Sequence, residues 1–113
     1  MAAGASLLDA PVLEHALLQV RPGIEDEFED AMRDALPIIA AQAGFRGACV
    51  TRGMESPGTY LLLVGWDTVD AHEVGFRGSA DYQRWRALLH RFYDPFPVVE
   101  HFVSPEAPLR TGE

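Results

Sequence analysis

The segment that most constrains the fold of this chain runs from Tyr60 to Trp66, reads YLLLVGW and carries no charge. Successive residues of a β-strand point to opposite faces, so a strand with this sequence is apolar on both faces. An apolar sheet face left open to water is typical of an interface. The segment therefore predicts a strand that needs cover on both sides, and it says more about assembly than about chemistry.

Hydrophobic periodicity and turn signals predict the other elements. The expected strands span residues 12–20, 45–52, 60–66 and 96–103. An amphipathic helix is expected over residues 24–43. Ser79 is a good N-cap for a second helix, which ends at Asp94, and a weaker helical segment is expected between Asp67 and Phe76.

The order strand, helix, strand, strand, helix, strand predicts an α+β fold with the ferredoxin-like βαββαβ topology. This topology gives a four-stranded antiparallel sheet in the order four, one, three, two, with both long helices on one face. A second copy of the sheet, packed about 10 Å away, is the simplest cover for the other face. We therefore expect one domain over residues 12–103 that forms an obligate homodimer, with flexible ends at 1–11 and 104–113.

The composition argues against several classes of protein. The net charge of −8, from 17 acidic and 9 basic residues, disfavours nucleic acid as a partner, because such binding needs clustered positive charge. The single cysteine, Cys49, excludes an intramolecular disulfide and is expected to be a small buried residue. The chain lacks a signal-like N-terminus and any run of about 18 apolar residues, so we expect a cytoplasmic protein with no membrane partner.

Several short segments form a recognisable pattern across residues 12–103. They are Val20 to Gly23, Ala43 to Phe45, Gly65-Trp66, Asp70 to His72, then Ser79, Tyr82 and Trp85, and finally Glu100 to Phe102. With this pattern the chain resembles the antibiotic biosynthesis monooxygenase family, a group of dimeric α+β barrel proteins.

The resemblance implies that the protein oxidises a small aromatic, quinol or polyketide-like molecule with O2 and without a metal or flavin cofactor. The deprotonated substrate itself then supplies the electron to oxygen. The sequence departs from the family in one respect, since members of known activity use an Asn beside the Trp and this chain contains no Asn. That departure argues against haem degradation of the type that pairs Asn, Trp and His.

Candidate catalytic residues are expected at one end of the sheet. Antiparallel pairing is expected to bring Trp66, His101 and His15 to the same end, and His72 follows Trp66 by six residues. Histidine suits proton removal near neutral pH, because its ordinary pKa is about 6.5. The catalytic candidates are His72, Trp66 and His101. The candidate substrate-binding residues are His15, Phe76, Tyr82, Trp85 and Phe92.

Each candidate also has a structural interpretation. Trp66 and Trp85 fit the role of core aromatics, and His72 fits that of a solvated surface residue. His101 fits a hydrogen-bonded interface residue, and His90 is expected to face outward. The four histidines are scattered and not at ligand spacing, so no metal site is expected.

Two alternatives to the monooxygenase remain open. The first is a non-catalytic dimeric module for binding or stress response, in which the histidines are structural. The second is a haem-binding or haem-degrading protein with His72 as the axial ligand.

Overall fold

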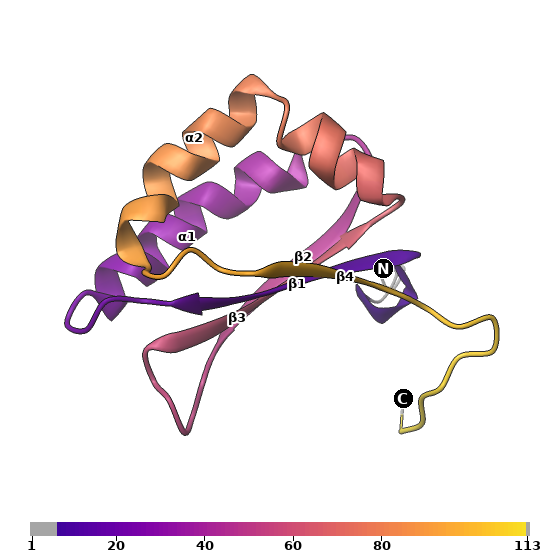
Figure 1. Ribbon diagram of the computed structural model, residues 1–113, viewed down its shortest axis with the longest axis horizontal. Coiled ribbons are helices and arrows are strands. Elements are labelled where there is room, and N and C mark those ends of the chain that lie inside the picture. The colour runs from indigo at the N-terminus through magenta and orange to yellow at the C-terminus, as the bar shows by residue number, and fades with distance from the viewer. Residues whose placement is uncertain (1–6, 113) are drawn as a thin grey trace.

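All four strands join one antiparallel sheet in the order β2-β3-β1-β4, and the two long helices lie on one face of it (Figure 1). The computed structural model describes residues 7–112. The strands are β1 (Val12–Gln19), β2 (Phe45–Arg52), β3 (Thr59–Trp66) and β4 (Val99–Val103). The helices are α1 (Glu25–Ala40) and α2 (Ala80–Leu89), with a π-helical segment η2 (Ala71–Phe76) and 3-10 turns η1 (Leu7–Asp9) and η3 (His90–Phe92). This confirms the predicted α+β fold, its ferredoxin-like topology and its strand order.

Most element boundaries lie within a few residues of the predicted ones. Helix α1 ends at Ala40, three residues before the predicted end. The N–H of the next residue, Ala41, bonds to the carbonyl of Ile38 in a tighter turn, and Gly44 adopts a φ of +84°. Strand β4 begins at Val99 rather than at residue 96, and Pro97 in the preceding segment lacks the N–H that a ladder bond needs. Ser79 caps α2 as expected, since its side chain accepts a hydrogen bond from the N–H of Tyr82.

The core lies between the sheet and the two long helices. Strand β1 alternates regularly, with Ala16 and Leu18 buried toward the helices and Leu17 and Gln19 exposed on the other face. Helix α1 packs against this layer because its apolar residues recur every three or four positions. Its buried residues are Phe28, Met32, Ala35, Ile38 and Ile39.

The sheet face opposite the helices is apolar at its centre. Leu17 pairs with Leu61, and Leu13 pairs with Phe102, so four large apolar side chains share this face. Leu17 is 44% exposed and Phe102 is 52% exposed. Below, the face opposite the helices is called the open face.

The N-terminal segment covers one end of the open face. A β-carbon on Gly65 would lie 2.8 Å from Cβ of Ala10 and 3.0 Å from Cδ1 of Leu7. Gly65 therefore permits this close approach. Residues 1–6 of the N-terminal segment that was expected to be flexible lie outside the described residues.

Cys49 is exposed, contrary to the expectation of burial. It pairs with Leu63 across β2 and β3, and this register places both residues on the open face, away from the helices. The exposure of Cys49 follows from its place in the alternation of β2, which points it away from the helices. The apolar character of the cysteine side chain does not determine its burial here.

Candidate functional site

Four side chains from four different elements meet between the sheet and the helices. Trp66 Nε1–H donates a 2.9 Å hydrogen bond to Oε1 of Glu14, and Nε2 of His72 lies 3.3 Å from the same oxygen. Nδ1 of His72 and Nε2 of His101 share a hydrogen bond of 2.8 Å. The rings of Trp66 and His72 stack, with centroids 5.4 Å apart and an interplanar angle of 16°. These four residues are called the inner polar cluster below.

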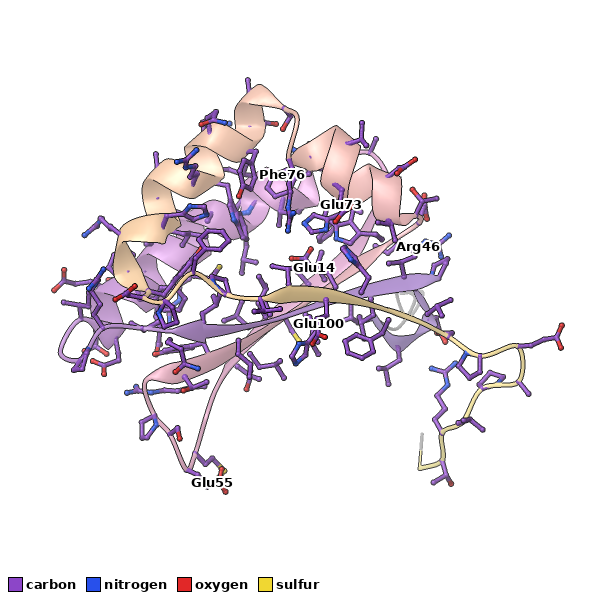
Figure 2. All side chains as sticks on the ribbon, viewed as in Figure 1. Glu14, Arg46, Glu55, Glu73, Phe76 and Glu100 are labelled. Atoms are coloured by element: carbon purple, nitrogen blue, oxygen red, sulfur yellow. The ribbon has the colours of Figure 1, made fainter. Side chains whose placement is uncertain are left out.

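The strand register brings the cluster together. Glu14 on β1 lies opposite His101 on β4 and opposite Val64 on β3, two residues before Trp66. All these positions face the helices, because residues two apart in a strand share a face. Figure 2 shows Glu14 and Phe76 in the layer between sheet and helices, with Glu100 on the other side of β4.

Segment η2 supplies the histidine that completes the cluster. Thr68 Oγ1 accepts a hydrogen bond from the N–H of Ala71, and the N–H of Arg77 bonds to the carbonyl of His72 five residues earlier. The segment buries His72, which is 3% exposed, and Phe76, which is 2% exposed. The interpretation of His72 as a solvated surface residue is therefore wrong.

Burial dominates the electrostatics of the cluster. It raises the pKa of the Glu14 carboxyl, while the hydrogen bond from Trp66 and the charge of Arg77 act in the opposite direction. Burial also lowers the pKa of His72 to about 3, with smaller contributions from Arg77 and His101. His72 is therefore a neutral imidazole at neutral pH, with one nitrogen as donor and the other as acceptor.

A small cavity adjoins the cluster. Its volume is about 40 Å³, and Glu14, His72, Phe76, Tyr82 and Trp85 are among the residues that line it. This volume accommodates water, which needs roughly 10–15 Å³. It is far below the roughly 300 Å³ at which ligand pockets for drug-sized molecules begin. A substrate of that size can enter only if lining side chains move.

A larger hollow of about 290 Å³ lies elsewhere, between α1 and the edge strand β2. Its polar side chains pair with one another, since Tyr60 OH donates to Oε2 of Glu29 and Arg52 lies 3.7 Å from the same oxygen. Burial and the neighbouring Glu29 raise the pKa of Tyr60 to about 12. These groups are engaged in fixed contacts, so we place the candidate site at the smaller inner cavity.

The predicted substrate-binding residues fall into two groups. Phe76, Tyr82 and Trp85 line the inner cavity. Phe92 is fully buried but packs against Phe28, with centroids 5.8 Å apart, and is not among the residues that line the cavity.

His15 lies on the open face, away from the inner polar cluster. It pairs with Glu100 and makes an edge contact with Phe102 at 5.7 Å between centroids. Neighbouring residues of a strand alternate in direction, so His15 faces away from the helices when Glu14 faces them. His15 thus lies at the same end of the sheet as Trp66 and His101, as predicted, but on the opposite face, so its predicted role as a substrate-binding residue of this site is wrong.

His90 lines the inner cavity, contrary to the expectation that it faces outward. Its ring contacts those of Tyr82, Tyr93 and Phe96 at centroid distances of 6.0, 5.7 and 5.1 Å. Burial lowers its pKa. Helix α2 ends at Leu89, and His90 begins the 3-10 turn η3.

Comparison with known proteins shows the family of this chain. The sequence model for antibiotic biosynthesis monooxygenase matches residues 11–88. The chain belongs to the antibiotic biosynthesis monooxygenase family. It is 54% identical over 91 residues to the uncharacterized protein YczJ of Bacillus subtilis (strain 168), a match that covers 80% of this chain and 96% of YczJ.

Two solved structures share the fold. A Bordetella bronchiseptica protein assigned to this family is 38% identical with a TM-score of 0.80, and the match covers 83% of this chain and 96% of that one. SnoaB, a cofactor-independent oxygenase from Streptomyces nogalater, is 18% identical with a TM-score of 0.73, covering 85% and 94%. At 18% identity the similarity to SnoaB shows the fold alone.

For this member of the antibiotic biosynthesis monooxygenase family, sequence reasoning missed Glu14. A signal was present, because Glu14 has the same phase as the buried residues Ala16 and Leu18 in an alternating strand. A carboxylate on the buried face of a strand is rare unless it has partners, and partners often mark a functional site.

Within residues 7–112, no helix is long and apolar enough to cross a membrane. The same part of the chain contains no group of three or more His, Cys, Asp or Glu residues arranged to hold a metal ion.

Proposed function

We propose that this protein is a cofactor-independent monooxygenase that oxidises a small aromatic, quinol or polyketide-like molecule with O2. The observation that carries the proposal is the inner polar cluster, buried beside a cavity lined by Phe76, Tyr82 and Trp85. Membership of the antibiotic biosynthesis monooxygenase family supports it.

The arrangement suits a reaction that begins with proton removal from a buried substrate. His72, which stacks on the buried Trp66, lines the cavity, and the aromatic side chains of Phe76, Tyr82 and Trp85 offer stacking partners for a flat substrate. Exclusion of water protects the carbanion or phenolate that reduces O2. The catalytic group in this proposal comes from the inner polar cluster, to which the predicted residues His72, Trp66 and His101 belong, and Phe76, Tyr82 and Trp85 bind the substrate.

Oxygen consumption tests this function directly. Purified protein should consume O2 when mixed with at least one member of a panel of anthrones, quinols and phenols, and an oxygenated product should appear by mass spectrometry. Trp85→Leu, which changes the cavity wall, should alter KM more than a change at the exposed Glu73 does. A complete lack of protein-dependent oxygen uptake across the panel would contradict the proposal.

We also propose that the functional unit is a homodimer in which two open faces pack together. The paired leucines and Phe102 on that face support this arrangement, since removing them from water is favourable. Light scattering at low micromolar concentration should give twice the mass of one chain. A stable monomer would contradict the dimer.

The small volume of the inner cavity favours a second candidate, a non-catalytic binding module. The protein's own side chains fill most of the space beside the inner polar cluster. Calorimetric titration with the same panel separates the two candidates, because binding without oxygen uptake supports the module.

Haem binding receives less support from the geometry. Nδ1 of His72 bonds to His101, and Nε2 lies against Glu14, so axial ligation would break one of these contacts. An absent spectral change on addition of haem would exclude this alternative.

A further inference from the structure

Glu14 lines the inner cavity beside His72 and is only 5% exposed. We propose that Glu14, rather than His72, is the catalytic residue that accepts the substrate's proton, and that His72 and His101 are positioning residues that hold its carboxylate in place. This assignment rests on the proposed monooxygenase function and makes its first step specific to one atom.

Both nitrogens of His72 already have partners. Nδ1 shares the 2.8 Å hydrogen bond with His101, and Nε2 lies 3.3 Å from Oε1 of Glu14. An imidazole can accept a substrate proton only through a free lone pair. His72 would have to break one of these contacts before it could act as the base.

Glu14 has a free oxygen. Oε1 accepts the hydrogen bond from Trp66 and faces His72, whereas Oε2 makes no hydrogen bond within the part of the chain that the structure describes. The carboxylate is thus held by one oxygen and keeps the other available. A general base must lie within hydrogen-bonding reach of the proton it removes, and a cavity-lining carboxylate satisfies this for a substrate in the cavity.

The electrostatics favour the same residue. Burial raises the pKa of the Glu14 carboxyl, which makes Glu14 a stronger base than an ordinary carboxylate. Burial lowers the pKa of His72 to about 3, which makes His72 a weak base. Arg77, at the end of η2, counteracts the shift of Glu14 and adds to that of His72. Burial raises the pKa of Tyr93, another residue that lines the cavity, and Tyr82 and Glu14 add smaller contributions in the same direction.

His101 fixes the tautomer of His72 in this arrangement. When Glu14 is ionised, His72 presents Nε2–H to it, and Nδ1 accepts the hydrogen from Nε2–H of His101. Trp66 and His72 then both offer N–H groups to Oε1. Loss of the donor at position 101 would let His72 turn its unprotonated nitrogen toward the carboxylate.

The step balances with O2 as the oxidant. A C–H bond of a CH2 group in the substrate breaks, its proton goes to Oε2 of Glu14, and the electron pair stays on the substrate as a carbanion. The carbanion gives one electron to O2, and the resulting radical pair combines to form a C–O bond and a peroxide anion. Glu14 returns its proton to this anion, and the hydroperoxide loses water to leave a ketone. The sum is CH2 plus O2 giving C=O plus H2O, with Glu14 unchanged.

Deprotonation can be observed apart from oxidation. A hydroxyanthrone changes absorbance when it ionises, so its anion can be followed under argon in the presence of the whole protein. The wild-type protein should form the anion, and Glu14→Gln, which keeps the shape and still accepts from Trp66, should form it about 100-fold more slowly. The matched control Glu73→Gln, at an exposed position of η2, should behave as wild type. Wild-type rates in Glu14→Gln would overturn the proposal.

The positioning role has its own readout. His101→Leu should shift the pH profile of anion formation, and His101→Gln, which retains an N–H donor, should restore it. If both variants shift the profile equally, or neither does, the role of His101 is refuted.

An infrared titration without any ligand keeps the test independent of the oxygenase activity. The spectrum of the wild-type protein should show one carboxyl that protonates above the ordinary pH range of glutamate, and Glu14→Gln should lack that band. Absence of the band in wild type, or its persistence in Glu14→Gln, would overturn the assignment. Absence of oxygen uptake with the band intact would instead refute the monooxygenase function. If Glu14→Gln does not fold, carboxyl NMR titration of the unmodified protein decides the same point.

Discussion

The indole N–H of Trp66 donates its hydrogen bond to the carboxylate of Glu14 across two adjacent strands, in a place where both side chains are buried. Because of this contact, the interpretation of Trp66 as a core aromatic is compatible with its interpretation as a residue of the candidate site. The side chain is a core aromatic, since it is fully buried, and it also fixes a polar group at the wall of the cavity.

Trp66→Phe should therefore destabilise the protein by about 1–3 kcal/mol, because Oε1 of Glu14 loses a buried hydrogen bond. The substitution should also raise the pKa of Glu14 further, since this hydrogen bond lowers it. Urea denaturation measures the first effect and infrared titration the second. Trp85→Phe is the control for loss of an indole, and an equal pKa change in that variant would contradict the explanation.

His72 should make stability fall as the solution becomes acidic. Its pKa drops from 6.5 to about 3 on folding, so between these values the unfolded state binds a proton that the folded state does not. The free energy of unfolding contributed by this residue is fully present above pH 6.5 and is lost toward pH 3.

The variant His72→Gln isolates this contribution. Its unfolding free energy should depend less steeply on pH between about 4.5 and 6.5, by up to roughly 1.4 kcal/mol per pH unit. Glu14 acts in the opposite sense, because its raised pKa lets the folded state bind a proton first, so the two slopes are compared at the upper end of this pH range. Identical slopes for the two proteins would refute the buried neutral imidazole.

Ser79→Ala should cost about 1 kcal/mol of stability, because Ser79 caps α2 through the N–H of Tyr82. Chemical denaturation measures the loss. Ser104→Ala, in the exposed C-terminal segment, should leave the midpoint unchanged, and a similar loss in both variants would argue against a capping effect.

Gly65→Ala should destabilise the protein by about 1–3 kcal/mol, because the added methyl would lie 2.8 Å from Cβ of Ala10. Gly75→Ala should be neutral or slightly stabilising, since the nearest atom there is 3.8 Å away. Thermal unfolding compares the pair. The reverse order would show that the N-terminal segment does not pack against β3 in solution.

Leu17→Asp should convert the proposed dimer into a monomer, because it places a charge at the centre of the open face opposite Leu61. Light scattering measures the mass. Leu109→Asp, at a residue that is 87% exposed in the C-terminal segment, should have no effect. A dimer that survives Leu17→Asp would mean that another surface joins the chains.

The fold followed from the sequence because its signals are local and repeated. The alternation of β1, the heptad-like spacing of α1 and the Ser79 cap each specify one element, and the order of elements then leaves few topologies. The limits of β4 were harder to predict because a hydrophobic run containing Pro97 is extended without joining the ladder.

The site was only partly predictable, because it depends on register. The residues Trp66, His72 and His101 could be named from the sequence, but the side chain that joins Trp66 and His72 is Glu14, and only the pairing of β1 with β3 and β4 reveals it. His15 and Cys49 were misplaced because a shift of one residue along a strand moves a side chain to the other face.

The alternation of β1 also constrains how this protein can evolve. Insertion or deletion of a single residue before Glu14 would shift the strand by one position and move the Glu14 carboxylate to the open face. The side chain of Leu13 or of His15 would then lie against Trp66 in its place. Length changes between residues 12 and 14 would therefore abolish the cluster even where every amino acid type was retained. Homologues should tolerate substitutions in this strand far more readily than gaps.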